Sequence, residues 1–283
     1  MMQKKVLAIN DISCVGRCSL TVELPIISAA GLECSILPTA ILSTHTGGFN
    51  DFTFLDFTKE MIKIVEKWKK INREFDCIST GFLGSKEQVS VVKNIVADFK
   101  NINKKTITIV DPAMADNGIL YKVFDNSFPS EMKQLCLEGD YIIPNITEAC
   151  LLTNIRYQEN NHDDQYIDEL INGLLACGMK NIVLTGVRKN NNHVGAIAYN
   201  YETKEKFYYE EELIPGYFHG TGDVFASVFT SFIAKGKNIE EAMKYSVIIT
   251  VEAIKETIKY KDIDFKYGVC FEEVIPSLVK YLK

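Results

Sequence analysis

The sequence contains no apolar run long enough to cross a membrane, since a membrane-spanning helix needs roughly 20 consecutive apolar residues. The apolar block at residues 6–9 is also too short for the core of a secretory signal. A formal net charge of −6 argues against non-specific binding to nucleic acid. These absences predict a cytoplasmic protein whose partners include neither a membrane nor nucleic acid.

Close cysteine pairs are nearly absent, although the chain contains eight cysteines. Cys14 and Cys18 are the only close pair, no Cys-x-x-Cys occurs, and the four histidines do not cluster with the cysteines. Several cysteines lie in apolar segments, where a free thiol behaves as a small hydrophobic group. The spacing therefore argues against a zinc site and against a disulfide framework.

Two common nucleotide-binding motifs are missing as well. The first predicted strand is followed by residues 13–16 (SCVG) rather than by G-x-G-x-x-G, and no G-x-x-x-x-G-K-[ST] sequence occurs. The pattern excludes a P-loop enzyme and disfavours a dinucleotide-binding protein.

Short buried strands alternate with amphipathic helices along most of the chain. One helix is predicted over residues 58–71, and Ser85 with Gln88 is typical of a capped helix start. Late in the chain, residues 194–209 predict an antiparallel hairpin. The alternation predicts one α/β domain over residues 1–283, with a doubly wound, mostly parallel sheet between two helix layers (αβα).

Most of the predicted strands end in polar residues or glycine. The predicted strand ends are Asp11, Thr39, Gly81, Asp111, Asn145 and Gly186. Residues 12–16, 43–49 and 113–122 are predicted to be loops or irregular segments. Because open α/β sheets bind ligands beyond the carboxyl ends of their strands, the functional surface is predicted at this edge.

A glycine-rich turn, Gly220-Thr221-Gly222, precedes Asp223 and a helical pattern. A helix that begins on such a turn directs free N–H groups and the positive end of its dipole at whatever lies in front. Asp223 is open to two interpretations. It is either an N-cap or a catalytic base beside an anion cradle, placed to take a proton from an alcohol that attacks a phosphate.

A second cluster at the predicted edge carries hydroxyl groups and flat rings. Ser13, His45 and Thr46 can hydrogen-bond a small polar ring, and His45 and Phe82 offer faces for stacking. Ordinary turn chemistry is the alternative role for the hydroxyl residues.

A third cluster is acidic and amide-bearing, and consists of Asp111, Asp116, Asn145 and Glu148. Oxygen ligands of this kind suit Mg²⁺ near phosphates, whereas helix capping is the alternative role for Asn145. Phosphoryl transfer requires a phosphate cradle, a metal ion and an oriented nucleophile, and the three clusters together supply all of these.

The chain resembles the ribokinase-like superfamily, and within it the vitamin kinase branch of pyridoxal/pyridoxamine kinases and hydroxymethylpyrimidine kinases. Four segments spread over the chain carry the resemblance. Residues 219–223 (HGTGD) are similar to the superfamily's anion-hole motif, and residues 111–116 (DPAMAD) to the family's DPVMGD loop. Residues 143–149 (IPNITEA) resemble TPN-x-x-EA, and residues 43–47 (STHTG) resemble the SNHTGY loop of pyridoxal kinases.

The resemblance implies a ribokinase-like fold and an ATP-dependent kinase for the 5′-hydroxymethyl group of pyridoxal, pyridoxamine or pyridoxine. Asp223 is then the expected catalytic base, and the N–H groups of Gly220, Thr221 and Gly222 are expected to stabilise charge on the transferring phosphoryl group. The implied contacts are Ser13, His45, Thr46 and Phe82 for the vitamer; Asp111, Asp116, Tyr121, Asn145, Thr185, Gly186 and Thr221 for ATP; and Asp111 and Glu148 for Mg²⁺.

Three positions depart from the family motifs. Ala115 replaces the glycine of DPVMGD, Ile143 the threonine of TPN, and Thr44 the asparagine of SNHTGY. These changes bear on the ATP site and on substrate preference more than on the type of reaction.

Two alternatives stay open: a hydroxymethylpyrimidine kinase of thiamin synthesis, which shares the cradle and the base, and a catalytically silent protein that binds a vitamer or nucleotide. The resemblance further implies Mg²⁺, a monovalent cation such as K⁺, and a homodimer, although no stretch of the sequence indicates an interface.

Overall fold

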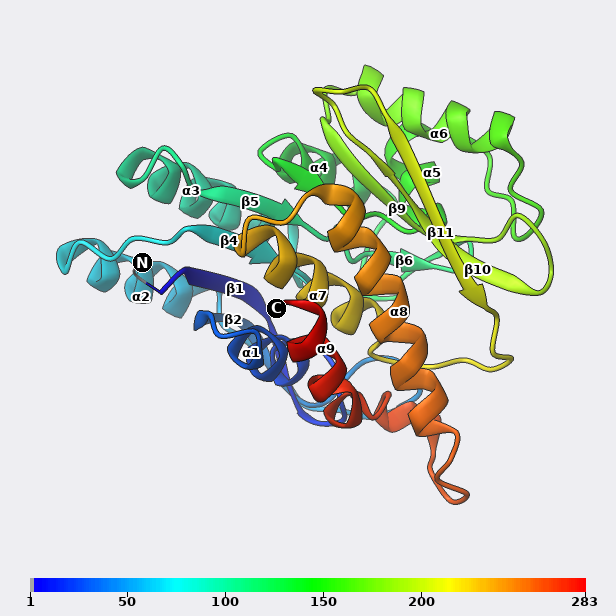
Figure 1. Cartoon of the computed structure of the whole chain (residues 1–283). Coiled ribbons are helices and arrows are strands. Elements are labelled where there is room, and N and C mark those ends of the chain that lie inside the picture. The colour runs from blue at the N-terminus through cyan, green and yellow to red at the C-terminus, as the bar shows by residue number, and fades with distance from the viewer. Residues whose placement is uncertain (1–2) are drawn as a thin grey trace.

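The computed structural model describes residues 3–283 and is built around a nine-stranded sheet (Figure 1). The strands lie in the order β11-β10-β9-β8-β5-β4-β1-β2-β3. Their bounds are β1 (Lys5–Val15), β2 (Glu33–Thr44), β3 (Phe54–Asp56), β4 (Cys77–Thr80), β5 (Ile107–Val110), β8 (Tyr141–Ile142), β9 (Asn181–Val187), β10 (His193–Tyr199) and β11 (Lys206–Glu212). The strands from β9 to β2 pair in parallel, whereas β3, β10 and β11 pair antiparallel to their neighbours.

Two layers of helices cover this sheet and enclose two hydrophobic cores (Figure 1). One face carries α1 (Leu20–Ala29), α7 (Thr221–Ala234), α8 (Ile239–Thr257) and α9 (Ile275–Tyr281); the other carries α2 (Thr58–Lys70), α3 (Lys86–Ile102), α4 (Phe128–Cys136), α5 (Ile146–Thr153) and α6 (Asp164–Ala176). Strand β1 is buried on both sides, with Val6 and Ala8 in the first core and Leu7 and Ile9 in the second. The predicted three-layer, mostly parallel α/β fold is confirmed.

A topological switch lies between β1 and β4. The chain passes from β1 to β2 on one side and later returns to β4 on the other side of β1. Asn10 lies on β1 at this point, and Gly81 directly follows β4. A Cβ atom at Gly81 would lie 2.3 Å from Nδ2 of Asn10, so the absence of a side chain lets these two segments approach. Ligands of open α/β sheets bind at such a switch.

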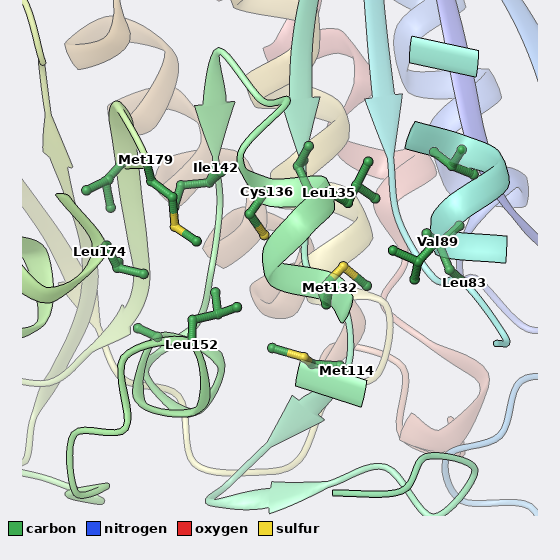
Figure 2. Packing of buried hydrophobic residues seen from close by; sticks show 14 of the residues in the cluster. Leu83, Val89, Met114, Met132, Leu135, Cys136, Ile142, Leu152, Leu174 and Met179 are labelled. Carbon is green, nitrogen blue, oxygen red and sulfur yellow. The ribbon is translucent and has the colours of Figure 1, made fainter. Parts of the chain in front are cut away.

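The core beneath α4 fixes the loop that follows β5 (Figure 2). Met114 belongs to that loop, is fully buried, and its side chain lies next to Met132 of α4. Two short strands, β6 (Ala115–Asp116) and β7 (Ile119–Leu120), continue the loop as an antiparallel pair. The prediction that residues 113–122 are irregular is therefore wrong for these strands.

Several predicted strand ends are also wrong. Strand β1 continues past Asp11 to Val15, because Ile12 and Ser13 pair with β2 after a register shift, so residues 12–16 are mostly strand rather than loop. Strand β2 likewise continues past Thr39 to Thr44, and β9 past Gly186 to Val187. Extra backbone pairing at the sheet edge overrides the local turn signals of serine and glycine.

Other elements differ less from the prediction. Ser85 caps α3 by accepting the Gln88 N–H at 3.2 Å, which confirms the predicted cap. The hairpin is confirmed, although β11 extends to Glu212. Strand β3 and helix α4 were not predicted, and the predicted last helix begins as a 3₁₀ turn, Phe271–Val274. Among residues 3–283, no helix has the length and apolar character needed to span a bilayer.

The single-domain prediction covers residues 1–283, of which Met1 and Met2 lie outside the described residues. Both helix layers pack on the one sheet, but the domain assignment itself stays a prediction.

Candidate functional site

Helix α7 begins at the glycine-rich turn that was predicted as an anion cradle. Gly220 is its N-cap with a φ of 77°, and a Cβ there would lie 2.1 Å from the Arg17 carbonyl oxygen. A Cβ at Gly222 would meet nothing within 4 Å, so the space beside the first turn is open. Asp223 lies three residues after the N-cap. The N-cap interpretation of Asp223 is therefore wrong, because Gly220 holds that position.

The carboxyl group of Asp223 lies in an environment that favours holding a proton. Burial raises its pKa to about 7, and the nearby charge of Asp11 acts in the same direction. Hydrogen bonds from the Ser19 backbone N–H and the Asn10 side chain oppose this shift. A carboxylate with a pKa near neutrality is suited to accept a proton at physiological pH.

Asp11 organises the end of β1 and the start of α1. Its carboxylate accepts hydrogen bonds from Ser13 Oγ at 3.0 Å and from Ser19 Oγ at 2.6 Å. Ser19, the N-cap of α1, has a φ of 57°, which is uncommon for a residue with a side chain. Ser13 is fully buried, so its hydroxyl lies beneath the site and is bonded to the protein itself.

Glu23 is a second buried carboxyl group, which the sequence interpretation missed. It projects from α1, accepts hydrogen bonds from Asn10 Nδ2 at 3.5 Å and Ser79 Oγ at 3.3 Å, and is 1% exposed. Burial first and the charge of Asp223 second raise its pKa to about 8. One sequence signal was available: a glutamate among apolar residues in a helix whose other buried positions are leucine, valine and isoleucine.

Asp111 and Glu148 meet on the far side of the switch point. Both oxygens of Glu148 are engaged: Oε1 accepts from the N–H groups of Met114 (3.0 Å) and Ala115 (3.5 Å), and Oε2 from that of Asn145 (2.9 Å). Burial and the charge of Glu148 raise the pKa of Asp111. The raised pKa of both groups indicates a site short of positive charge.

These carboxylates fit a cation only in part. Within the described chain, no three His, Cys, Asp or Glu side chains form a group that could hold a metal ion. Glu148 already accepts three N–H groups, whereas Asp111 makes no side-chain hydrogen bond to the described residues. The donor set fits a hydrated Mg²⁺ held by one carboxylate and by substrate phosphates better than a cage of protein ligands.

The predicted nucleotide residues have mixed positions. Asn145 is the N-cap of α5 in a full capping box with Glu148, and its Nδ2 donates to the Ala115 carbonyl at 2.8 Å. The capping alternative for Asn145 is confirmed. Thr185 bridges to the backbone of Asn145, and Gly186 beside it is exposed with a φ of 71°.

Asp116 and Tyr121 lie in the hairpin segment after β5. The Tyr217 hydroxyl donates to Asp116 at 3.1 Å and so joins this segment to the loop before α7. Burial and the charges of Glu148 and Asp116 raise the pKa of Tyr121, whose hydroxyl therefore stays protonated. The Thr221 side chain donates to its own turn, at the Phe218 carbonyl.

His45 has both ring nitrogens engaged within the protein. Nδ1 accepts the Gly47 N–H at 3.2 Å, which leaves Nε2 to donate to the Lys266 carbonyl. Burial lowers the pKa of His45, and burial together with His45 lowers that of His219 to about 4, so both rings are neutral. Their centroids lie 4.7 Å apart. No hydrogen bond engages the Thr46 side chain within the described residues.

Phe82 and His45 were both predicted to pack on the pyridine ring of the substrate. The backbone N–H of Phe82 donates to Asn10 Oδ1 at 2.9 Å, but the Phe82 ring packs against Phe124 at 5.7 Å, whereas His45 packs against His219 and Phe49. The two rings therefore do not pack on each other. The structure brings Asp223, Asp11, Glu23 and Asp111 into electrostatic range, and it adds Asn10, Ser19, Tyr217 and His219 to the predicted site.

Comparison with known proteins identifies the family. The phosphomethylpyrimidine kinase family model matches residues 22–267, and the chain belongs to that family. A Bacteroides thetaiotaomicron protein assigned as a phosphomethylpyrimidine kinase, in a crystal form with pyridoxal, is 34% identical, with a TM-score of 0.91 and coverage of 98% of this chain and 96% of that one. The predicted resemblance to the vitamin kinase branch is confirmed.

Two further relatives carry pyridoxal kinase names. The pyridoxal kinase of Lactobacillus plantarum is 26% identical, with a TM-score of 0.87 over 99% of this chain and 98% of that one. A pyridoxine/pyridoxal/pyridoxamine kinase of Bordetella avium is 24% identical over 84% of this chain and 80% of its own length.

Proposed function

We propose that this chain transfers the γ-phosphoryl group of ATP to the 5′-hydroxymethyl group of pyridoxal, pyridoxamine or pyridoxine, and so forms the 5′-phosphate for pyridoxal phosphate salvage. The observation that carries the proposal is the position of Asp223 in the first turn of α7, one residue after Gly222, beside which the space is open. Its raised pKa of about 7 suits a base. The relatives named as pyridoxal kinases, and the relative crystallised with pyridoxal, support the choice of substrate.

In the proposed reaction, the hydroxymethyl oxygen of the vitamer forms a bond to the γ-phosphorus of ATP while Asp223 accepts the proton of that hydroxyl group. The bond from that phosphorus to the bridging oxygen breaks, and ADP leaves with the electron pair. Negative charge on the transferring group is stabilised by the N–H groups of Gly220, Thr221 and Gly222 and by the helix dipole. The ionised form of Asp223 is the active one, so activity rises as pH increases through about 7.

We propose that Asp111 holds Mg²⁺. Its carboxylate makes no hydrogen bond to the described residues, and burial together with the nearby charges of Glu148, Asp223 and Glu23 raises its pKa. When bound, Mg²⁺ neutralises charge on the phosphate oxygens. Glu148 acts through the backbone of the loop after β5, or through water, since three N–H groups occupy its oxygens. A monovalent cation, K⁺ by family resemblance, completes the proposed set of ions.

The vitamer is proposed to lie against His45, Thr46 and Phe82. Because both nitrogens of His45 are engaged, this residue offers a ring face rather than a hydrogen bond, and the Thr46 hydroxyl is the free polar group. Ser13 supports the site from beneath through Asp11. The ATP contacts proposed for Asp116, Tyr121, Thr185, Gly186 and Thr221 follow the family motifs.

The second candidate is a hydroxymethylpyrimidine kinase, which the family description itself supports. Phosphate transfer from ATP with Mg²⁺ and K⁺ separates the two, with pyridoxal, pyridoxamine, pyridoxine and hydroxymethylpyrimidine as parallel acceptors. The proposal predicts a higher kcat/KM for a pyridine than for the pyrimidine. Dominant pyrimidine turnover would move the protein to thiamin synthesis, and vitamer binding without turnover would favour a silent binding protein.

We also propose that the enzyme is a cytoplasmic homodimer. Support comes from the family resemblance alone. Sedimentation analysis of the purified protein tests the oligomeric state, and a monomer at all concentrations would contradict it.

A further inference from the structure

Glu23 is a buried acidic group that the proposed reaction does not use. Its side chain lies between α1 and the switch point of the sheet, and only 1% of the residue is exposed. No lysine, arginine or histidine of residues 3–283 forms an ion pair with it; its hydrogen-bond partners are the Asn10 amide and the Ser79 hydroxyl. A buried charge without a cationic partner is costly, so this environment favours the neutral acid.

Only one orientation of the Asn10 amide satisfies the hydrogen-bonding groups around it. Its Oδ1 accepts the backbone N–H groups of Asp11 and Phe82, each at 2.9 Å, which fills both lone pairs of the oxygen. Its Nδ2 is closely packed against Gly81, where a Cβ would lie 2.3 Å away. Nδ2 donates to Glu23 Oε2 at 3.5 Å, and a hydrogen bond from the same side chain lowers the pKa of Asp223.

We propose that Glu23 is a positioning residue for phosphoryl transfer, which as a neutral carboxylic acid accepts one N–H of Asn10 and thereby orients the other toward Asp223. This inference rests on the proposed kinase function. Glu23 touches neither substrate, and it acts on the base through one amide. The hydrogen bond from Asn10 favours the ionised form of Asp223, which is the form that accepts the proton.

A second chain of contacts ties Glu23 to the helix that carries the base. Ser79 of β4 donates to Glu23 and receives a hydrogen bond from Thr230 of α7 at 3.3 Å. Glu23 therefore links α1, β1, β4 and α7 at one buried point. Loss of its carboxyl group releases both the Asn10 amide and the Ser79 hydroxyl.

The groups that surround Glu23 keep its proton in place at neutral pH. The packed elements present Asn10 and Asp11 from β1, Cys34 from β2, Ser79 from β4, Asp111 after β5, and Asp223 and Thr230 from α7. All of these are neutral or acidic. Above about pH 8 Glu23 ionises and adds a second negative charge beside Asp223, where phosphate must bind.

The test compares wild type with Glu23→Gln, Glu23→Ala and the control Glu66→Gln, which changes an exposed glutamate of α2. Steady-state kcat and KM for ATP and pyridoxal are measured from about pH 6 to about pH 9. The amide of Glu23→Gln mimics the neutral acid, so kcat at pH 7 is expected to stay within about twofold while the decline above pH 8 disappears. The Glu23→Ala change is expected to lower kcat about 10–100-fold with KM for ATP little changed.

A readout without turnover keeps the inference separate from the kinase assignment. The infrared band of a protonated carboxyl group is recorded at pH 7 for wild type and for Glu23→Gln, and the difference spectrum is expected to contain one such band. Absence of that band, or a normal kcat in the folded Glu23→Ala variant, would overturn the inference. An inactive wild type that retains the band would contradict only the proposed function.

Discussion

The environment of Asp223 suits a catalytic base but reduces the stability of the folded protein near neutral pH. The folded-state pKa of Asp223, about 7, exceeds that of an unfolded aspartate, about 3.9, so the folded protein binds the proton more tightly. The stability that this group contributes is present below about pH 4 and is lost as pH rises through about 7. A base of this kind reduces stability at the pH at which it works.

Replacement of Asp223 by asparagine is expected to lower kcat about 10²–10⁴-fold, because the proton acceptor is lost. The same variant is expected to melt at a higher temperature than wild type at about pH 8, because a partly buried charge with a raised pKa is removed, with a smaller difference at about pH 5. Calorimetry at both pH values and initial rates check the two effects. Near-normal kcat in the folded variant would contradict the assignment of Asp223 as the catalytic base.

Gly220 and Gly222 form a matched pair for the cradle. Gly220→Ala places a Cβ 2.1 Å from a backbone carbonyl at a φ of 77°, so stability is expected to fall by more than about 1–2 kcal/mol. Gly222→Ala meets no atom within 4 Å and lies in a helix, so stability is expected to stay or rise by about 0.5–1 kcal/mol. Its methyl group enters the space proposed for phosphate, so kcat/KM is expected to fall. Denaturant titration and kinetics of both variants distinguish fold from function, and an active, stable Gly220→Ala protein would contradict the role of the turn.

At the scale of elements, the start of α5 and the loop after β5 form one unit. Glu148 reaches the N–H groups of Met114 and Ala115 while it closes the capping box with Asn145. Helix α4 covers the same loop through Met114 and Met132 (Figure 2). A residue that the sequence assigns to metal binding thus holds together two elements that carry other proposed ATP contacts.

Variants of Glu148 and Asp111 are expected to show different defects. Glu148→Gln keeps one acceptor for three N–H groups, so we expect a loss of about 1–3 kcal/mol of stability. Asp111→Asn breaks no side-chain hydrogen bond to the described residues, so stability is expected to hold while the affinity for ATP in the presence of Mg²⁺ falls. Chemical unfolding and nucleotide titration measure the two effects. Equal losses of stability in both variants would contradict the division of roles.

At the scale of the whole molecule, several carboxyl groups converge on the end of one sheet. Burial raises the pKa of Asp223 to about 7 and those of Glu23 and Glu148 to about 8. The sheet topology brings these groups together, because β1 and β4 are neighbours, Thr230 of α7 donates to Ser79 of β4, and Gly220 at the start of α7 approaches Arg17 just after β1. In the proposed function, cations balance the negative charge of these carboxyl groups and of the phosphates.

The ligand-free protein is therefore expected to lose stability as pH rises from about 4 to about 8. All three folded-state pKa values lie above those of the unfolded chain, so the unfolded state releases these protons at lower pH. Melting temperatures across this range measure the slope, and the Asp223→Asn variant should give a shallower one. A stability that increases steadily over the same window would contradict the expectation.

The sequence by itself determined the fold class and the glycine-rich turn before Asp223, and it predicted the sheet edge at which we propose that ligands bind. Each follows from local signals: buried strands alternating with amphipathic helices, polar residues at strand ends, and two glycines where a helix begins. Family motifs supplied the type of reaction. None of these depends on which strand lies next to which.

Only the tertiary structure decided how the site is held together. Glu23 meets Ser79 across 56 residues of sequence, and Ser79 meets Thr230 across 151, because β1, β4, α1 and α7 converge at the switch point. Hydrogen bonds within the fold also engaged both nitrogens of His45 and both oxygens of Glu148. A side chain's role depends on the partners that compete for its polar atoms, and those partners come from distant parts of the chain.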